Sequence, residues 1–392
     1  MDITATEFLK RAANTSEHFG FSALSTYKKN PACKNCQVTI KHRANATDRK
    51  TDAMHGLLTS GINAYSDFKL NGMEGPVLYY NAEQVPRSGE VAISLQVLGV
   101  EKSIAEAILI QTMRAIATDI GYENSVVRIN SMGDADSSAR YSRELNNYFR
   151  KRIELLPSSA RELMKDHILF ALMHLIEKDH ELAHKSPNSL EYLSDQSRKH
   201  FREIVEYLDM SETPYEIDPL LLGDNSCYSD ALFALDFLDK DGNRLTHAPF
   251  VARGGRYNNF MNKFSDEPKA AAGAVLVLKE KKAPLRAHGV ARKENPSVYV
   301  IQLGFGPKIR SLLLIDELRQ AGIPVYQNLA SDSLSEQLRD AENRKVRYAV
   351  IIGQKEYSEK NVILRDIGAA NQESVQISSL LGRLKRRQTQ TS

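Results

Sequence analysis

Residues 251–260 read VARGGRYNNF, and the rest of the chain is interpreted outward from this stretch. Gly254 and Gly255 stand directly before a cation, Arg256, and an aromatic residue, Tyr257. Glycine adopts backbone angles closed to other residues and lets a ligand approach the main chain closely. The guanidinium that follows presents forked donors that suit a carboxylate or a phosphate. The pattern therefore predicts either a substrate-binding turn or an ordinary tight turn with a solvated arginine.

The composition is that of a globular protein with more than one domain. A chain of 392 residues exceeds one core of ordinary size, and 42% hydrophobic with 26% charged residues is unremarkable for a soluble protein. The net charge of +3 is too small to indicate nucleic-acid binding by itself. The basic stretches at 279–293 and 383–387 predict a solvated linker and tail, or contact with a polyanion. Without a long apolar run or a signal-like N-terminus, a cytoplasmic location is expected.

Two groups of residues resemble metal ligands only in part. Cys33 and Cys36 form a single CxxC, and His42 would be at best a third zinc ligand, so a reduced thiol pair is expected. His180 and His184 have the i, i+4 spacing of two ligands on one helix face, but no third ligand is evident. We expect no metal site.

The hydrophobic pattern divides the chain into two architectures. Up to residue 278, helices and β-rich segments predict an antiparallel sheet flanked by helices, with a charged, largely helical insertion at about 153–212. A basic linker spans 279–297, and residues 298–392 alternate strand and helix as in a small α/β domain with a largely parallel sheet. The fold class is therefore α+β followed by α/β. Predicted helices are 3–18, 103–120, 137–152, 268–278, 307–321, 333–343 and 377–387, and predicted strands are 77–80, 91–95, 126–129, 215–237, 246–252, 298–303, 324–326, 348–352 and 362–364.

Several segments, taken in order, resemble one known family. Residues 128–134, RINSMGD, look like its strand-and-turn segment, and residues 190–201, LEYLSDQSRKHF, look like its LDYLDEESREHF segment. The segments SLSEQLRD, YAVIIG and VILRDI between residues 333 and 367 follow the order of its anticodon-binding domain. With GGRY at 254–257, the chain resembles histidyl-tRNA synthetase, a class II aminoacyl-tRNA synthetase, over most of residues 3–385.

The resemblance implies chemistry that the sequence lacks at several positions. Members of this family join a carboxylate to the α-phosphate of ATP, so arginines and magnesium must stabilise developing negative charge. The arginine position of the second motif reads Asn-Ala-Glu at 81–83, with Arg87 the nearest arginine. The RGLDYY run corresponds to GDNSCY at 223–228, which keeps Tyr228 but not the arginine. The third motif has Lys279-Glu280 in place of Glu-Arg, and the RPEGT segment becomes RANAT, beginning at Arg43.

Three functions follow from the resemblance. The first is a synthetase-like protein, homodimeric by family resemblance, that has lost amino-acid activation and acts by binding tRNA, another RNA or a partner protein. The second is a divergent but active histidine–tRNA ligase, which alone would require ATP and magnesium. The third is a regulatory subunit of ATP phosphoribosyltransferase. Substrate-binding candidates are Arg43, Arg87, Tyr228, Gly254, Gly255, Arg256 and Tyr257, RNA-binding candidates are Arg347, Lys355 and Lys360, and no catalytic residue is assigned.

Overall fold

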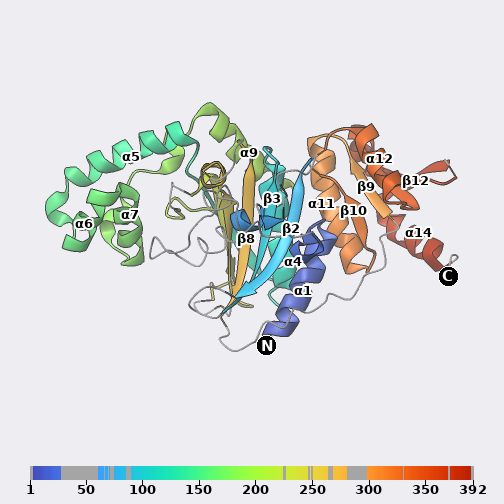
Figure 1. Ribbon diagram of the computed structural model, residues 1–392, viewed down its shortest axis with the longest axis horizontal. Coiled ribbons are helices and arrows are strands. Elements are labelled where there is room, and N and C mark those ends of the chain that lie inside the picture. Colours follow the sequence, from blue (N-terminus) through green and yellow to red (C-terminus); the bar gives the residue numbers. More distant parts are fainter. Residues whose placement is uncertain are drawn as a thin grey trace, which may run out of the picture.

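A large, mainly antiparallel sheet lies at the centre of the computed structural model, between a helical insertion and a C-terminal α/β domain (Figure 1). The predicted fold class is confirmed. The strands are ordered β1-β2-β3-β8-β7-β6-β4-β5, and the pairs β1–β2 and β4–β5 are parallel. The structure describes residues 3–27, 61–65, 67, 68, 70, 75–84, 90–223, 227–245, 248, 250–263, 268–279, 298–329, 331–369 and 371–389. The strands are β1 (Ser22–Ala23), β2 (Val77–Gln84), β3 (Val91–Leu98), β4 (Ser125–Ser131), β5 (Tyr215–Ile217), β6 (Ser229–Phe237), β7 (Phe250–Arg256) and β8 (Ala271–Leu278).

Helices cover one face of this sheet. The Thr4 side chain caps α1 (Ala5–His18) by accepting a hydrogen bond from the Glu7 amide. The second helix, α4 (Ile104–Asp119), was predicted at 103–120 and is buried on nearly all sides. It contacts the sheet, α1 and α9 (Asp195–Met210) at once, which explains its largely apolar sequence. A short helix, α10 (Asn258–Met261), follows β7.

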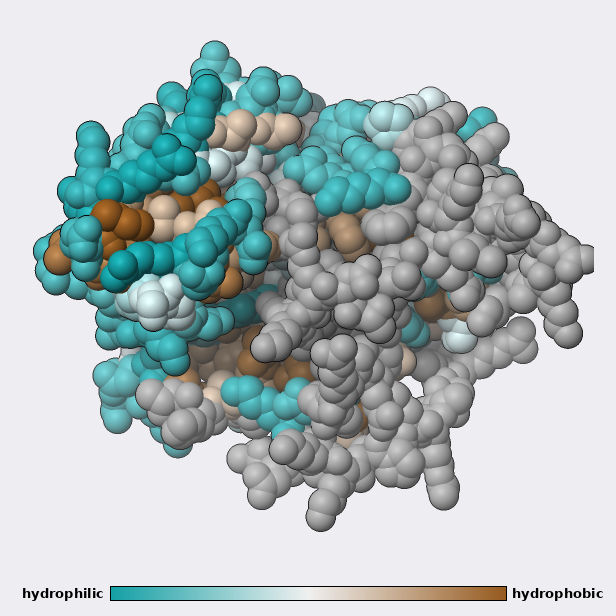
Figure 2. All heavy atoms as spheres, turned by 60° about the vertical axis from the view of Figure 1, so that its left-hand side comes forward, coloured by the Kyte–Doolittle hydropathy of each residue, from teal (hydrophilic) through white to brown (hydrophobic). Residues whose placement is uncertain are grey.

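A helical insertion extends away from the sheet (Figure 1). It begins with α5 (Ala135–Arg150), before the predicted bound of about 153, whereas α9, inside the predicted range 153–212, packs in the core of the large sheet. Its small core includes Leu145, Phe149 and Leu172. Figure 2, which turns this side forward, shows hydrophobic residues in a patch among hydrophilic ones. Leu155, in a 3₁₀ turn of the insertion, is 64% exposed. Its elements are α5 (Ala135–Arg150), α6 (Ser158–Asp166), α7 (Ile168–Glu177) and α8 (Glu181–His184), with 3₁₀ turns at Ile153–Leu155 and Ser189–Tyr192.

The C-terminal domain is built on a five-stranded sheet in the order β10-β9-β11-β12-β13. β10, β9 and β11 are parallel, as predicted, whereas β12 and β13 are antiparallel to their neighbours, and β13 was not predicted. Ser333 caps α12 by accepting a hydrogen bond from the Glu336 amide. The elements are β9 (Val298–Gln302), α11 (Phe305–Gln320), β10 (Val325–Gln327), α12 (Leu334–Asn343), β11 (Tyr348–Ile352), α13 (Gln354–Glu359), β12 (Asn361–Asp366), β13 (Asn371–Gln376) and α14 (Ile377–Thr389).

The two parts of the chain share one apolar core. Residues of α1, α4 and α9 belong to the same buried cluster as residues of α11, β9 and β11. Polar contacts line the seam between the two parts. Asp119, at the end of α4, accepts two hydrogen bonds of 2.7 Å from Arg319 of α11 and another from Thr15 of α1. The C-terminal domain is therefore fixed against the helices that cover the large sheet.

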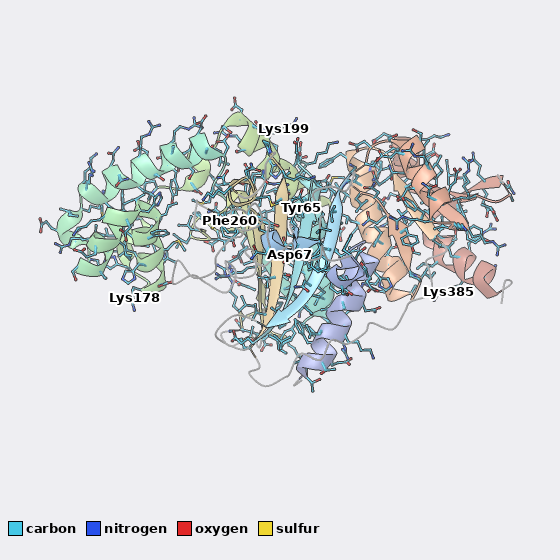
Figure 3. All side chains as sticks on the ribbon, viewed as in Figure 1. Tyr65, Asp67, Lys178, Lys199, Phe260 and Lys385 are labelled. Atoms are coloured by element: carbon cyan, nitrogen blue, oxygen red, sulfur yellow. The ribbon has the colours of Figure 1, made fainter. Side chains whose placement is uncertain are left out.

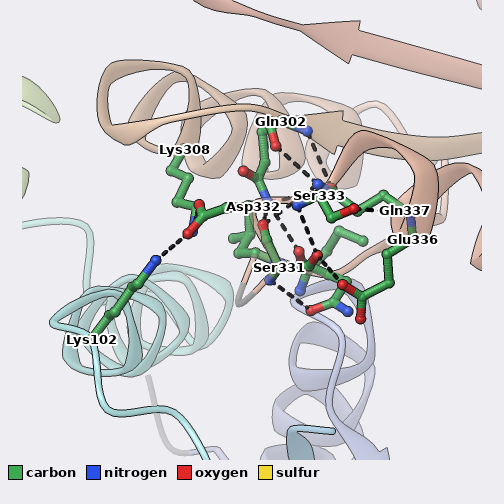
Figure 4. A network of polar contacts seen from close by, with 11 residues as sticks. Lys102, Gln302, Lys308, Ser331, Asp332, Ser333, Glu336 and Gln337 are labelled. Carbon is green, nitrogen blue, oxygen red and sulfur yellow. Dashed lines mark hydrogen bonds and ion pairs between the residues drawn. The ribbon is translucent and has the colours of Figure 1, made fainter.

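A second group of contacts closes the other end of this seam (Figure 4). The carboxylate of Asp332 pairs with Lys308 of α11 at 2.6 Å and with Lys102, which lies just before α4. The ring of Phe305 packs on Tyr207 of α9, with centroids 4.5 Å apart. Apolar burial and ion pairs thus both stabilise the packing of α11 against the helices that cover the large sheet.

One predicted helix is a strand. Residues 268–278 read as small and then apolar, and a helix was predicted, but residues 271–278 form β8, buried along its whole length. β8 pairs with β3 on one side and with β7 on the other, so its backbone hydrogen bonds are supplied by segments distant in sequence. A strand buried on both faces shows no alternation of polar and apolar residues, so the hydrophobic pattern of 268–278 did not indicate a strand.

The predicted turn at 254–257 is likewise largely strand. Gly254, Gly255 and Arg256 are the last residues of β7, and the chain turns only at Tyr257. A side chain at Gly254 would collide with the Phe233 ring and lie 2.7 Å from the carbonyl oxygen of Gly273. The two glycines therefore allow close packing of neighbouring strands.

Two kinds of feature are absent from the described part of the chain. No helix there is long and apolar enough to cross a membrane. Among the same residues, no group of three or more His, Cys, Asp or Glu side chains is placed to hold a metal ion. His184 instead lies 2.8 Å from the Asp179 carboxylate. Cys33, Cys36 and His42 lie outside the described residues.

Candidate functional site

The central strand β7 carries two arginines on opposite faces of the sheet. Successive residues of a strand point to opposite faces, so residues three apart, such as Arg253 and Arg256, do so as well. Phe250 and Ala252 join the core beneath the helices, as expected for even-numbered positions of this strand. Arg256 therefore points to the helix-covered face of the sheet, and Arg253 points to the opposite face.

Arg256 is bound to a carboxylate of its own chain. Its side chain is 1% exposed, and its Nε and Nη2 atoms donate to the two oxygens of Glu106 on α4 at 2.7 and 2.8 Å. Nη1 donates to the carbonyl of Val100 at 3.0 Å, and Nη2 also donates to the carbonyl of Lys102. The alternative of a solvated arginine in a turn is therefore wrong. The forked geometry expected for a ligand carboxylate is used here to join α4 to the sheet.

His200 on α9 completes this buried group. Its Nε2 atom lies 3.0 Å from the Glu106 carboxylate. Burial by itself would raise the pKa of Glu106, but the charges of Arg256 and His200 outweigh it and lower that pKa to about 2. Burial also opposes protonation of His200, yet the Glu106 charge prevails and raises the pKa of His200 above its ordinary 6.5. The group thus links α4, α9 and β7 through two cations and one anion.

This arrangement predicts a defined pH dependence of stability. Because the pKa of His200 is higher in the folded chain than in the unfolded chain, protonated His200 stabilises the fold. This contribution to the free energy of unfolding is fully present below pH 6.5 and is lost as pH rises through the folded pKa. We expect the His200→Gln variant to lose stability relative to wild type below pH 6.5, and the difference to shrink at higher pH. The measurement is the free energy of unfolding in urea at a series of pH values. A difference that is the same at every pH would contradict the assignment.

The opposite face of the sheet holds most of the predicted substrate-binding residues that are described. Tyr257 is buried, and its hydroxyl donates to the Oε1 atom of Gln96 on β3. Beside them, Gly255 and Tyr228 are close together, because a β-carbon at Gly255 would lie 3.3 Å from Tyr228 Cδ1 and 2.8 Å from the Ala231 carbonyl oxygen. The structure thus brings Tyr228, Gly255 and Tyr257 to one face. It places Arg256 on the other face.

The positions expected to supply activating arginines lie on the same sheet. Asn81 is on β2 opposite Ser94 of β3, and Ala82 next to it is exposed. Lys279 follows β8 directly and is also exposed. Arg43 and Arg87 lie outside the described residues.

Sequence reasoning missed several residues of this region. Gln96, Glu106 and His200 are distant in sequence from the stretch at 251–260, and only the fold brings them beside it. Arg253 could have been found, because strand alternation alone places it on the face opposite to Arg256.

The predicted RNA-binding residues do not form one cluster. Arg347 directly precedes β11. The first residue of β11, Tyr348, pairs with Asp366, the last residue of β12. Lys360 precedes the first residue of β12, which pairs with the last residue of β13. Lys355 lies on α13, at the same edge as Lys360. The length of β11 therefore separates Arg347 from the two lysines by roughly 16 Å.

α14 extends between the end of the sheet that carries Lys360 and the end that carries Arg347. It starts beside Lys360, whose carbonyl accepts a hydrogen bond from the Ile377 amide, and Leu380 and Leu384 are buried in the core. Arg383 lies 3.5 Å from Glu373 of β13, so the helix runs back along that strand toward the edge of Arg347. The exposed residues Lys385 and Arg386 follow on its outer side. Cations thus border the domain from one edge to the other.

Comparisons with known proteins agree with this architecture. The model of the family described as "Anticodon binding domain" matches residues 298–387. The histidine–tRNA ligase of Geobacillus sp. is 25% identical over 316 residues, covering 80% of this chain and 74% of the relative. The ligase of Fervidobacterium nodosum is 27% identical over 294 residues, covering 74% of this chain and 68% of the relative.

A solved structure was also found. Apo histidyl-tRNA synthetase of S. aureus aligns with a TM-score of 0.46 and 18% identity, covering 83% of this chain and 81% of that chain. The ligases match most of the chain, and the C-terminal domain has its own family match. The chain is therefore similar to histidine–tRNA ligases over most of its length, and its residues 298–387 match the anticodon-binding domain family.

Proposed function

We propose that this protein binds RNA through its C-terminal domain and has lost amino-acid activation. The observation that carries the proposal is the absence of arginine from the positions where the family resemblance expects it. Asn81 and Ala82 stand at the second-motif position on β2, and no arginine occurs between residues 223 and 228. The third-motif segment is the strand β8, which ends at Leu278 and is followed by Lys279.

The loss matters because the reaction accumulates negative charge. Removing one well-placed donor to a developing anion commonly slows a reaction by about 10²–10³-fold. Several such losses together leave little activation of an amino acid by ATP. Arg256 does not restore the charge, because it is paired with Glu106 on the other face of the sheet.

RNA binding is supported by the C-terminal domain. Its family model is that of an anticodon-binding domain, and the relatives are ligases that act on tRNA. Lys355 and Lys360 are exposed at one edge, and the basic outer side of α14 runs from there toward Arg347. Cations spaced along such a border suit contacts with successive phosphates, which position an RNA without reading its sequence.

The first test is the ATP–pyrophosphate exchange reaction with histidine. We expect no histidine-dependent exchange from chain that is folded, as judged by circular dichroism. Exchange at a rate typical of a working ligase would overturn the loss of activation and favour the ligase.

The second test is binding of a histidine tRNA transcript at several salt concentrations. We expect affinity to fall steeply with salt, and the Lys355→Gln and Lys360→Gln variants each to reduce the slope of log K against log salt by about 1. Lys178→Gln is the control, because Figure 3 shows Lys178 on the insertion, far from Lys385. No binding of the transcript, with ATP phosphoribosyltransferase co-purifying instead, would replace the proposal by the regulatory subunit.

A further inference from the structure

The segment between β3 and α4, residues 99–103, contacts both parts of the chain. The carbonyl of Val100 accepts a hydrogen bond of 3.0 Å from Arg256 Nη1, and the carbonyl of Lys102 accepts one of 3.2 Å from Arg256 Nη2. The side chain of Lys102 binds the carboxylate of Asp332 in the C-terminal domain (Figure 4). One residue thus contacts the end of β7 through its backbone and the C-terminal domain through its ammonium group.

Asp332 is held in place by its own domain. Its carboxylate pairs with Lys308 at 2.6 Å, and the Lys308 side chain is 3% exposed. Burial by itself would raise the pKa of Asp332, but hydrogen bonds from Lys102 and Lys308 lower it below its ordinary value, so the carboxylate is charged at neutral pH. Because Lys308 lies in the first turn of α11, a displacement of that helix also moves the carboxylate that Lys102 binds.

The other end of this connection is buried in the large sheet. Arg256 is 1% exposed, and the amide of the next residue, Tyr257, donates to the carbonyl of Ala271 on β8 at 2.8 Å. The carbonyl of Lys102 also accepts a hydrogen bond of 3.2 Å from the Ala105 amide in the first turn of α4. A shift of Lys102 would therefore disturb the first turn of α4 and the end of β7 together.

The two ends of the connection differ in their exposure to solvent. The side chains of Lys102 and Asp332 are 61% and 45% exposed, whereas those of Arg256 and Glu106 are 1% and 0% exposed. An exposed ion pair is weak and is screened by salt, and a buried pair is screened much less. The contact between Lys102 and Asp332 can therefore break while the buried group remains intact.

We propose that Lys102 is a releasable link through which the C-terminal domain controls the order of the end of β7. While Lys102 is bound to Asp332, residues 99–103 are held against Arg256. When that contact breaks, this segment and the end of β7 fluctuate more. The strand end carries Gly255 and leads to Tyr257, so the link acts on residues of the open face of the sheet. It requires neither RNA binding nor the loss of activation.

The test is amide hydrogen exchange of the full chain, followed by mass spectrometry on peptides that cover 99–107 and 250–261. We expect about threefold to fivefold faster exchange of both peptides in Lys102→Gln, and exchange as in the wild type in Lys102→Arg. Asp332→Asn breaks the same contact from the other domain and should give the same increase in both peptides. Raising the salt concentration to about 1 M should speed exchange in the wild type but not further in Lys102→Gln.

Arg11→Gln is the matched control for Lys102→Gln. Arg11 is 46% exposed and donates to the carbonyl of Asp119 at the other end of the seam, so its loss should leave both peptides unchanged. Equal exchange of the 250–261 peptide in the wild type and Lys102→Gln would overturn the link, and so would an equal increase in Arg11→Gln. We expect the same midpoint of urea unfolding in the wild type and Lys102→Gln. A lower midpoint with faster exchange throughout the chain would show general destabilisation and would likewise overturn the link.

Discussion

The Glu106→Gln variant is expected to lose about 3–5 kcal/mol of unfolding free energy at pH 7. The substitution keeps the size of the side chain but removes the charge that faces Arg256. Arg256 is 1% exposed and is bound to both oxygens of Glu106, so it would remain as a buried charge without its carboxylate. The measurement is urea unfolding followed by circular dichroism.

A surface carboxylate provides the control. Glu162 pairs with Lys165 at 2.8 Å, but both side chains are 71% exposed, so Glu162→Gln should change stability by less than about 1 kcal/mol. If Glu106→Gln is no more destabilising than this control, the buried group does not hold α4 to the sheet.

The Leu312→Ala variant is expected to destabilise both parts of the chain together, by about 2–5 kcal/mol. Leu312 is 3% exposed and lies four residues after Lys308 and seven before Arg319, on the face of α11 that meets the seam. Because one apolar cluster extends through the seam, a cavity at Leu312 should weaken packing on both sides. Hydrogen exchange should show faster opening of α4 as well as of β9.

Leu334→Ala is the matched control for this prediction. Leu334 is 40% exposed at the start of α12, so the same truncation should leave exchange in α4 unchanged and cost little stability. Faster exchange confined to the C-terminal domain in Leu312→Ala would show that the two parts unfold independently.

Local patterns in the sequence predicted much of the fold. The helices predicted at 3–18 and 333–343 are present, and the hairpin of β2 and β3 follows the β-rich residues on either side of a turn. The alternation of strand and helix after residue 298 likewise indicated the α/β domain. Each of these signals depends on neighbouring residues only.

The remaining features depend on contacts between distant residues. β8 was predicted as a helix because full burial removes its periodicity, and only pairing with β3 and β7 makes it a strand. The partner of Arg256 is Glu106, 150 residues earlier, so no local pattern could reveal that this arginine is bound internally. The candidate site was predicted in part, since Tyr228, Gly255 and Tyr257 share a face, whereas Gln96 and Arg253 were not singled out.

The continuous core between the two parts has an evolutionary consequence. A domain joined only by a linker can be lost, duplicated or fused to another gene with little cost to its neighbour. Here the removal of α11 would expose buried apolar residues of α1 and α4 and leave Asp119 without Arg319. The C-terminal domain is therefore not an interchangeable module, and a lineage that dispensed with it would have to evolve a new polar surface on the first domain.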